Sequence, residues 1–230
     1  MKIINNGLAQ YSRCYYGKND IYDLFANSED SFGLIGDFFD RKARGVVLDL
    51  GCGSGKYSLL LSQKAKKYIG LDLSEKQIEL AKKKVINQAN IEFICSSATK
   101  IGLPDNCIDF GISCWVLGTI LDKRQRRKVV TQIKRVLKKE GEFYLIENDF
   151  EGEFEKLRRG INDLRTIDYN NWLLDNGFKV YKKINTQFEF ADLNQAKIVF
   201  GEIWGKGVAD KIKHRFIEHK IVIFKLSTKV

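Results

Sequence analysis

The feature that most constrains this chain is a glycine-rich loop between a continuous apolar segment and an amphipathic one. Residues 45–50 read Gly-Val-Val-Leu-Asp-Leu, and Gly51, Gly53 and Gly55 follow directly. A continuous apolar run is typical of a strand buried on both faces of a parallel sheet. Because glycine has no Cβ, the loop can turn tightly and let a ligand approach its backbone. The sequence therefore predicts a strand–loop–helix unit that binds its ligand beyond the carboxyl ends of the strands.

The middle of the chain continues this alternation of short apolar segments with helical patterns. Further strands are predicted at residues 68–71, 91–95, 108–114 and 142–147. A basic amphipathic helix with Leu137 on its inward face precedes the last of these strands, and Glu140 and Gly141 are expected to end that helix. Such alternation predicts βαβ units around a parallel sheet.

The two ends of the chain lack this alternation. Residues 1–43 are predicted to be a helical cap or lid over the carboxyl edge of the sheet. They carry many aromatic residues: Tyr11, Tyr15, Tyr16, Tyr22, Phe25, Phe32, Phe38 and Phe39. After residue 150, a strand at about 178–190, a helix near 193–204 and a closing strand at 221–224 predict an antiparallel pair. We expect one domain over residues 1–230, with residues 44–150 as its cofactor-binding half and residues 151–230 as its substrate-side half.

Several classes of protein are excluded by what the chain lacks. No apolar window approaches the roughly 18 residues of a transmembrane helix, and no signal-peptide-like run opens the chain. A cytoplasmic protein without membrane contact is therefore expected. The five cysteines show no CxxC spacing, which argues against a disulfide framework and a zinc site. The two histidines, His214 and His219, are five residues apart and cannot by themselves form a usual metal site, so metal catalysis is not expected. Both lie in a lysine-rich segment and are expected to be solvated.

The residues around the loop indicate which ligand it binds. A dinucleotide site has the spacing GxGxxG, whereas this loop has GxGxG, with Lys56 at the position of the third glycine. Asp49 precedes the loop, where a carboxylate would repel a diphosphate and attract an ammonium group. Asp72 ends the second strand, where it can accept hydrogen bonds from both ribose hydroxyls. One ribose, a nearby cation and no diphosphate describe S-adenosylmethionine, and they disfavour a nucleotide-dependent oxidoreductase.

The same stretch resembles a known family. LDLGCGSGKY followed by GLDLS is similar to the first two motifs of class I S-adenosylmethionine-dependent methyltransferases. Later segments resemble further family motifs in order: Leu103-Pro104 before Ile108-Asp109, CWVL at 114–117, and RVLKKEG at 135–141 in place of RVLKPGG. The resemblance covers about residues 45–148. It implies an α/β fold with a seven-stranded, mostly parallel sheet in the order 3-2-1-4-5-7-6, strand 7 antiparallel, and helices on both faces.

The resemblance also implies roles by position. The methionine end of S-adenosylmethionine would be held by Asp49 and by the backbone of Gly51, Cys52, Gly53 and Gly55. Cys114 and Trp115 would flank the sulfonium. Cys52 is interpreted as a small filler of the loop rather than as a nucleophile.

The nucleoside end would meet residues from the second and third strands. Asp72 would bind the ribose, and Leu73 would pack on the adenine. Ser96, Ser97 and Ala98 resemble the family's GDA segment. Ser97 stands where an aspartate usually accepts a hydrogen bond from the adenine amino group, so a hydroxyl would have to accept there.

The expected chemistry is in-line displacement of the methyl group from sulfur to a nucleophilic N, O, C or S atom, which leaves S-adenosylhomocysteine. Because the sulfonium is already activated, the protein mainly supplies proximity, alignment and exclusion of water. Glu147, at the end of the fifth strand, is placed to be a general base, and a sheet-end carboxylate facing water is the alternative.

The acceptor is expected to be a small molecule, in a pocket shaped by residues 1–43 and 150–219. The net charge of +10 keeps RNA as an alternative acceptor, although lysines spread over helix surfaces favour a solvated surface. A third hypothesis is a non-catalytic S-adenosylmethionine-binding module. This hypothesis is supported by two departures from the family motifs, which are Ser97 in place of aspartate and the absence of the PGG segment.

Overall fold

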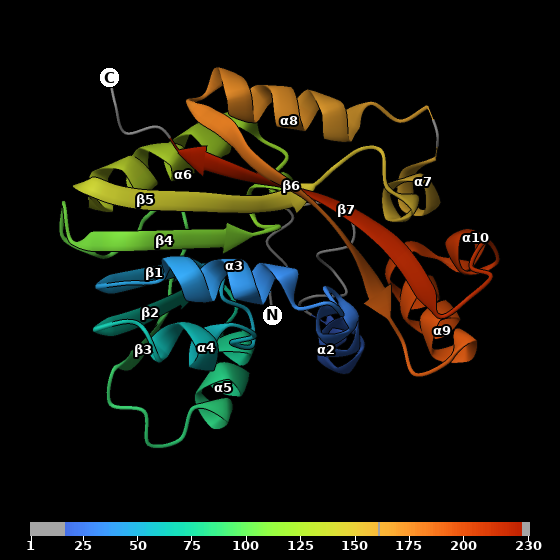
Figure 1. Cartoon of the computed structure of the whole chain (residues 1–230), viewed down its shortest axis with the longest axis horizontal. Coiled ribbons are helices and arrows are strands. Elements are labelled where there is room, and N and C mark those ends of the chain that lie inside the picture. The colour runs from blue at the N-terminus through green and yellow to red at the C-terminus, as the bar shows by residue number, and fades with distance from the viewer. Residues whose placement is uncertain (1–16, 161, 227–230) are drawn as a thin grey trace.

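The computed structural model describes residues 17–160 and 162–226, and a seven-stranded sheet runs through its centre (Figure 1). The strands lie in the order β3-β2-β1-β4-β5-β7-β6, and β7 is antiparallel to both of its neighbours. The predicted fold class and strand order are confirmed. The strands are β1 (Val46–Leu50), β2 (Lys67–Asp72), β3 (Ile91–Cys95), β4 (Ile108–Cys114), β5 (Leu137–Asn148), β6 (Phe178–Glu189) and β7 (Phe216–Leu226).

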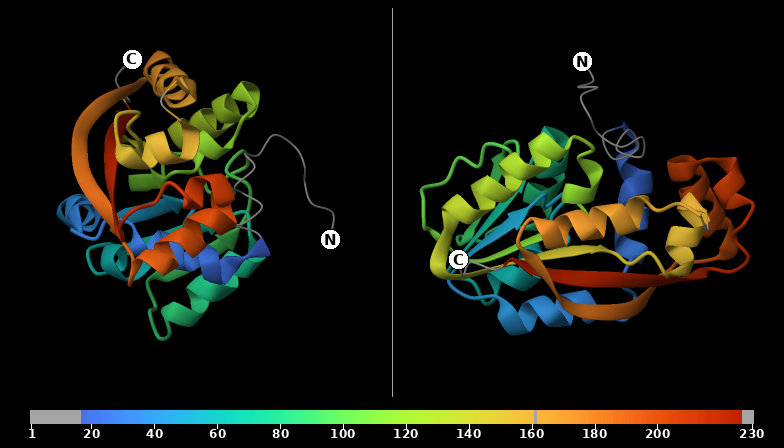
Figure 2. Two further views of the ribbon diagram at one scale, coloured as in Figure 1. Left: turned by 90° about the vertical axis from the view of Figure 1, so that its right-hand side faces the viewer. Right: turned by 90° about the horizontal axis from the view of Figure 1, so that it is seen from above.

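Helices cover both faces of the sheet (Figure 2). One face buries the apolar sides of α6 (Lys123–Val136) and α8 (Arg165–Asp175). The opposite face buries those of α3 (Leu34–Lys42) and α4 (Ser58–Ser62). Both layers exist because the central strands are apolar on both sides, as their continuous runs predict. The remaining helices are α2 (Asn19–Ser28), α5 (Glu75–Lys84), α7 (Glu153–Arg159), α9 (Leu193–Trp204), α10 (Lys206–Ala209) and the short 3₁₀ helix η1 (Leu117–Thr119).

A separate apolar cluster lies where the long β6–β7 hairpin extends past the sheet. It joins α7, α9 and the ends of β6 and β7 around a group of aromatic rings, and Phe25 of α2 packs against it. Figure 1 shows α2 beside α9 at this end of the molecule. The described part of the N-terminal segment is helical as predicted, whereas Tyr11, Tyr15 and Tyr16 lie outside the described residues. The division into one domain with two halves stays a prediction.

One predicted helix end is wrong. Helix α6 ends at Val136, and Leu137 already begins β5. Leu137 is buried in either arrangement, so its apolar character could not distinguish the two. A Cβ on Gly141 would lie 2.8 Å from the carbonyl oxygen of Ile108. Gly141 is therefore needed for close approach to β4 rather than to stop the helix.

Within the described residues, every helix is too short or too polar to span a membrane.

Candidate functional site

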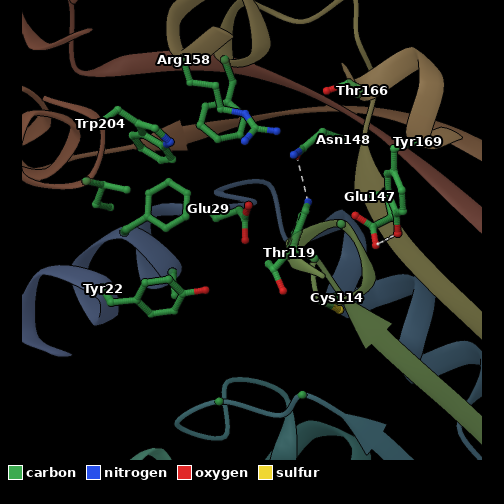
Figure 3. Close-up of a pocket in the computed structure, with 18 of the residues that line it drawn as sticks. Tyr22, Glu29, Cys114, Thr119, Glu147, Asn148, Arg158, Thr166, Tyr169 and Trp204 are labelled. Atoms are coloured by element: carbon green, nitrogen blue, oxygen red, sulfur yellow. Dashed lines mark hydrogen bonds between the residues drawn. The ribbon is translucent and has the colours of Figure 1, made fainter. Parts of the chain in front are cut away.

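A cavity of about 900 Å³ lies at the carboxyl ends of β1, β4 and β5 (Figure 3). Its walls come from the glycine loop, the turn after β4, α2, the α7–α8 region and α9. Seven predicted site residues line it: Asp49, Gly51, Cys52, Gly53, Cys114, Trp115 and Glu147. The other five lie outside its lining: Gly55, Asp72, Leu73, Ser97 and Ala98.

The glycine loop is fixed against the second strand. The N–H groups of Gly51 and Cys52 donate to the carbonyl of Leu71 at 2.6 and 3.1 Å. Gly51 has a left-handed backbone with φ +81°, and a Cβ there would overlap the side chain of Val116. Only glycine fits this position without displacing the turn after β4.

Gly55 has a different reason to be glycine. A Cβ at this residue would lie 3.0 Å from the Ser58 hydroxyl and 3.1 Å from Cβ of Ala81. The missing side chain therefore lets the loop pack against α4 and α5. This contact explains the third glycine without a ligand.

Asp49 lies at the end of β1, 3% exposed. Its Oδ2 accepts a hydrogen bond from the Tyr68 hydroxyl at 2.8 Å. Burial raises the pKa of Asp49 to about 7, the negative charge of Asp72 adds to the rise, and the Tyr68 hydrogen bond opposes it. A carboxyl in this state becomes an anion readily when a cation comes near.

Asp72 connects the loop to the next helix. Its Oδ2 accepts from the Gly53 N–H at 3.0 Å, and its Oδ1 accepts from the Ser74 N–H at 2.8 Å. Ser74 in turn caps α5, because its hydroxyl oxygen accepts a hydrogen bond from the Gln77 N–H. Asp72 thus orders the loop, and its binding of ribose stays a prediction.

The predicted adenine contacts lie beyond the cavity. Leu73 is 45% exposed, which leaves an apolar face open to solvent. The Ser97 hydroxyl lies 2.8 Å from the Thr99 hydroxyl and accepts from the Thr99 N–H. Ala98 packs on the hydrophobic core. The Ser97 oxygen is therefore engaged within its own turn.

The last residue of β4, Cys114, and the first residue of the following turn, Trp115, line the cavity. Trp115 has a left-handed backbone with φ +54°, and its indole Nε1–H donates to Asn148 Oδ1 at 3.0 Å. Burial raises the pKa of the Cys114 thiol well above its usual value, and the charge of Asp49 raises it further. Burial does the same to Cys52. Both thiols therefore stay protonated, and neither is suited to act as a nucleophile.

Glu147 is buried at the end of β5, with 3% of its surface exposed. Its Oε1 accepts from the Tyr169 hydroxyl at 2.7 Å. Burial raises the pKa of Glu147 to about 7, against the opposing hydrogen bonds from Tyr169 and the Gly118 backbone. The carboxyl lines the cavity with donors already in place.

The surface position expected for His219 is wrong. Its side chain is fully buried, and its Nε2 lies 2.8 Å from Asn148 Oδ1. The neighbouring lysines misled the prediction, because alternate residues of a strand point to opposite faces. His214 is exposed, as expected.

Several cavity residues belong to no motif of the sequence, although some lie in the segments expected to shape the acceptor pocket. They come from segments far apart in the chain and include Tyr22, Phe25, Glu29, Asn148, Phe154, Arg158 and Trp204. Only the packing of α2, α7 and α9 around the β6–β7 hairpin brings them together. Within the described residues, no group of three or more His, Cys, Asp or Glu side chains is arranged to hold a metal ion.

Residues 48–145 match a sequence family described as a methyltransferase domain. The "Uncharacterized methyltransferase YcgJ" of Bacillus subtilis is 29% identical over 127 residues, which are 54% of this chain and 49% of that protein. An "Uncharacterized RNA methyltransferase NEQ053" of Nanoarchaeum equitans is 37% identical over 68 residues, 29% of this chain and 15% of that protein. The chain spans about half the length of YcgJ and less of NEQ053.

Solved structures share the fold. The crystal structure of YcgJ superposes with a TM-score of 0.57 at 19% identity, covering 84% of this chain and 95% of that one. A SAM-dependent methyltransferase from Aquifex aeolicus superposes with a TM-score of 0.58 at 20% identity, covering 94% and 93%. These structural similarities establish the architecture.

Proposed function

Because the chain belongs to the class I family of S-adenosylmethionine-dependent methyltransferases, we propose that it transfers a methyl group from S-adenosylmethionine to a small-molecule acceptor. The observation that carries this proposal is the burial of the Asp49 carboxyl next to the glycine loop. This carboxyl lies beside a bare glycine backbone, with a pKa of about 7. An ammonium group there would stabilise the anion, whereas a diphosphate would be repelled.

The residues near Asp49 fit this cofactor. The missing side chains at Gly51 and Gly53 leave backbone open to the methionine end, and Asp49 would pair with its ammonium group. Asp72 would accept from the ribose hydroxyls, and the exposed face of Leu73 would support the adenine. The Ser97 hydroxyl would contact the adenine amino group only by rearranging its bond to Thr99. Cys52 and Gly55 shape the loop, and Ala98 backs the adenine side.

The protein's own contribution to methyl transfer is position and shielding. Bound S-adenosylmethionine supplies a methyl group on a positively charged sulfur, already activated for displacement. The indole of Trp115 is held by Asn148 at the cavity wall, and Cys114 lies next to it. Both would exclude water from the reacting atoms, which favours attack by the acceptor.

The acceptor side of the cavity fits an organic molecule with an apolar body. It is lined by the rings of Tyr22, Phe25, Phe154 and Trp204. The whole cavity, of which the acceptor side is one part, measures about 900 Å³, and this lies within the usual range for small-ligand sites. We therefore favour a small-molecule acceptor.

The sequence predicts Glu147 as the general base, and its exchange for Gln tests that prediction against a second buried carboxyl of the cavity, Glu29. The Oε1 of Glu147 already accepts from Tyr169, so an amide could keep that contact. Glu147→Gln is expected to lower turnover and leave cofactor affinity unchanged. Unchanged turnover in a single-turnover assay would remove Glu147 from this role.

RNA is the second candidate acceptor. Relatives named RNA methyltransferases match this chain, and Lys123, Arg159 and Arg165 are among the cavity residues. Binding of single-stranded RNA that weakens steeply with salt would favour this alternative. No RNA binding at low salt would exclude it.

Two measurements test the proposed function. Calorimetric titration with S-adenosylmethionine and with NAD should give binding of the first alone, and tight NAD binding would overturn the assignment. Incubation with methyl-labelled S-adenosylmethionine and a fractionated cell extract should then label a small molecule. Binding without label in any fraction would support the non-catalytic module instead.

A further inference from the structure

A second buried carboxyl, Glu29, enters the cavity from the end of α2. It is 6% exposed and lines the cavity. Figure 3 shows Glu29 between the Tyr22 and Trp204 side and the Thr119 and Asn148 side of the cavity. No motif of the cofactor half includes this residue.

Glu29 has a histidine behind it. Its Oε1 lies 3.5 Å from Nδ1 of His219 on β7. The other ring nitrogen, Nε2, lies 2.8 Å from Asn148 Oδ1, which also accepts the Trp115 indole N–H. Because an amide oxygen only accepts, Nε2 of His219 carries the hydrogen. Nδ1 therefore directs a lone pair toward Glu29.

The ring of His219 stays neutral. Burial lowers the pKa of His219 well below its usual value, and the positive charges of Arg158 and Lys56 lower it further. Among the described residues, Nδ1 has no hydrogen-bond partner at normal distance. A small rotation of the Glu29 carboxyl would bring its protonated oxygen onto this lone pair.

The surroundings of Glu29 hold it near the protonated state. Burial raises the pKa of Glu29 to about 8, Lys56 lowers it, Asp30 raises it and Arg158 lowers it. The Lys56 ammonium is 3.9 Å from Glu29 Oε2. Cys114 and Tyr57 also interact electrostatically with Glu29, and burial raises the pKa of each, so both stay neutral.

The two cavity carboxyls differ in what already binds them. Glu147 accepts a full hydrogen bond from Tyr169 at 2.7 Å. Glu29 faces a lone pair at 3.5 Å and a lysine at 3.9 Å. When Glu29 is ionised, its carboxylate therefore has room to accept a further hydrogen bond. When Glu29 is protonated, its O–H can donate to Nδ1 of His219.

We propose that Glu29, supported by the neutral ring of His219, is the catalytic residue that accepts the proton of a weakly acidic O–H or N–H group on the methyl acceptor. The inference rests on the proposed methyl transfer. A bond forms between the acceptor oxygen or nitrogen and the methyl carbon, and the carbon–sulfur bond breaks with its electron pair staying on sulfur. The acceptor's proton passes to the Glu29 carboxylate, whose O–H then points to His219 Nδ1.

The first test measures the interaction between Glu29 and His219 directly and does not require a methyl acceptor. The chain has two histidines, so ¹⁵N-histidine NMR of the full chain gives two resolvable rings. We expect His219 to be the Nε2–H tautomer. We also expect the ¹⁵N chemical shift of its Nδ1 to change near pH 8, where Glu29 ionises. Glu29→Gln should abolish this step. An Nδ1–H tautomer, or the same step in Glu29→Gln, would overturn the proposal.

A matched control uses the other histidine–glutamate pair of the chain. Glu153 Oε1 lies 3.7 Å from Nε2 of the exposed His214. Glu153→Gln should leave the Nδ1 step of His219 in place. Loss of the step in this variant would mean that the step does not report on Glu29, and would equally overturn the assignment.

The second test separates proton removal from methyl transfer. Phenol must lose its proton to attack, whereas thiophenol is similar in shape and largely ionised in water at mildly alkaline pH. Glu29→Gln should slow methylation of phenol roughly a hundredfold and methylation of thiophenol less than about threefold. Equal losses with both probes, or an unchanged phenol rate, would overturn the role of Glu29.

The two proposals can fail separately. Loss of S-adenosylmethionine binding by the wild-type protein would count against the proposed function. Normal binding and normal thiophenol methylation without the His219 step would count against Glu29 alone. Calorimetry on Glu29→Gln should give unchanged cofactor affinity, which shows that the variant is folded.

Discussion

The cofactor side and the acceptor side of the cavity are built in different ways. The cofactor side is backbone: a glycine loop bonded to Leu71 and tied by Asp72 to the next helix. The acceptor side is side chains, with aromatic rings and charged groups from α2, α7, α8 and α9. The first depends on contacts among neighbouring strands, and the second on packing between segments distant in the chain.

This difference indicates which side of the cavity can tolerate amino-acid substitutions. A backbone site has almost no freedom to adjust, because a Cβ at Gly51 would overlap Val116 and one at Gly55 would press on Ser58 and Ala81. A side-chain site can be remodelled residue by residue without moving the sheet. One scaffold can therefore keep its cofactor while the acceptor changes. The predictions that follow test this separation.

The largest effect is expected at the backbone of the cofactor side. Gly51→Ala places a Cβ against Val116 at a left-handed position, which costs roughly 1–2 kcal/mol in backbone conformation alone. Affinity for S-adenosylmethionine should fall at least about a hundredfold in calorimetry, because the contact moves the loop as well. Gly102→Ala is the control, since a Cβ there meets nothing within 4 Å. Equal affinity for both variants would contradict a rigid loop.

Asp49→Asn should have the next largest effect. A hydrogen bond to a charged group contributes about 1.5–3 kcal/mol, so affinity should fall roughly tenfold to a hundredfold. Wild-type affinity should rise as pH increases through about 7, where the Asp49 carboxyl ionises, and the variant should lose this rise. Calorimetry below and above neutral pH measures both effects. A pH-dependent rise that survives in Asp49→Asn would assign it to another group.

On the acceptor side, Trp204→Leu should act on transfer and spare the cofactor. Trp204 lines the cavity and packs against Phe25 with ring centroids 5.3 Å apart. Loss of this wall should slow methylation of a bound aromatic acceptor roughly tenfold, as about 1.4 kcal/mol of contact is lost. Affinity for S-adenosylmethionine should change less than about twofold. A parallel loss of cofactor affinity would show that the two sides are coupled.

The smallest effect is on stability, through the buried carboxyls. Glu29 has a raised pKa of about 8, so its stabilising protonated form is complete below its unfolded value of about 4.5 and is lost as pH rises through 8. Glu29→Gln stays neutral, so its free energy of unfolding should exceed that of the wild type by more at pH 8 than at pH 4.5, and the difference should be at least the roughly 1.4 kcal/mol that one pKa unit represents. Urea unfolding at the two pH values measures the difference. A difference that does not grow with pH would mean that Glu29 ionises normally.

Much of the fold follows from patterns that neighbouring residues carry. The order of the seven strands was predicted and is confirmed. The end of α6 was not, because Leu137 is buried in either structure and only the pairing of β5 with β4 distinguishes them. His219 was misplaced for a similar reason: its burial depends on β7 lying between β5 and β6. The roles of the cofactor residues, from Asp49 to Trp115, stay predictions.

The order of residues along the chain by itself determined the glycine loop, the two acidic residues around it and the alternation that forms a parallel sheet. These are local properties, since a missing Cβ or an apolar run has the same meaning wherever it occurs. Tertiary structure alone decided that Glu29, Asn148 and His219 meet, and that aromatic rings from three distant helices close one cavity. Those contacts arise when helices and strands from distant parts of the chain pack together to bury apolar surface. No short segment contains the information about which distant segment it will pack against.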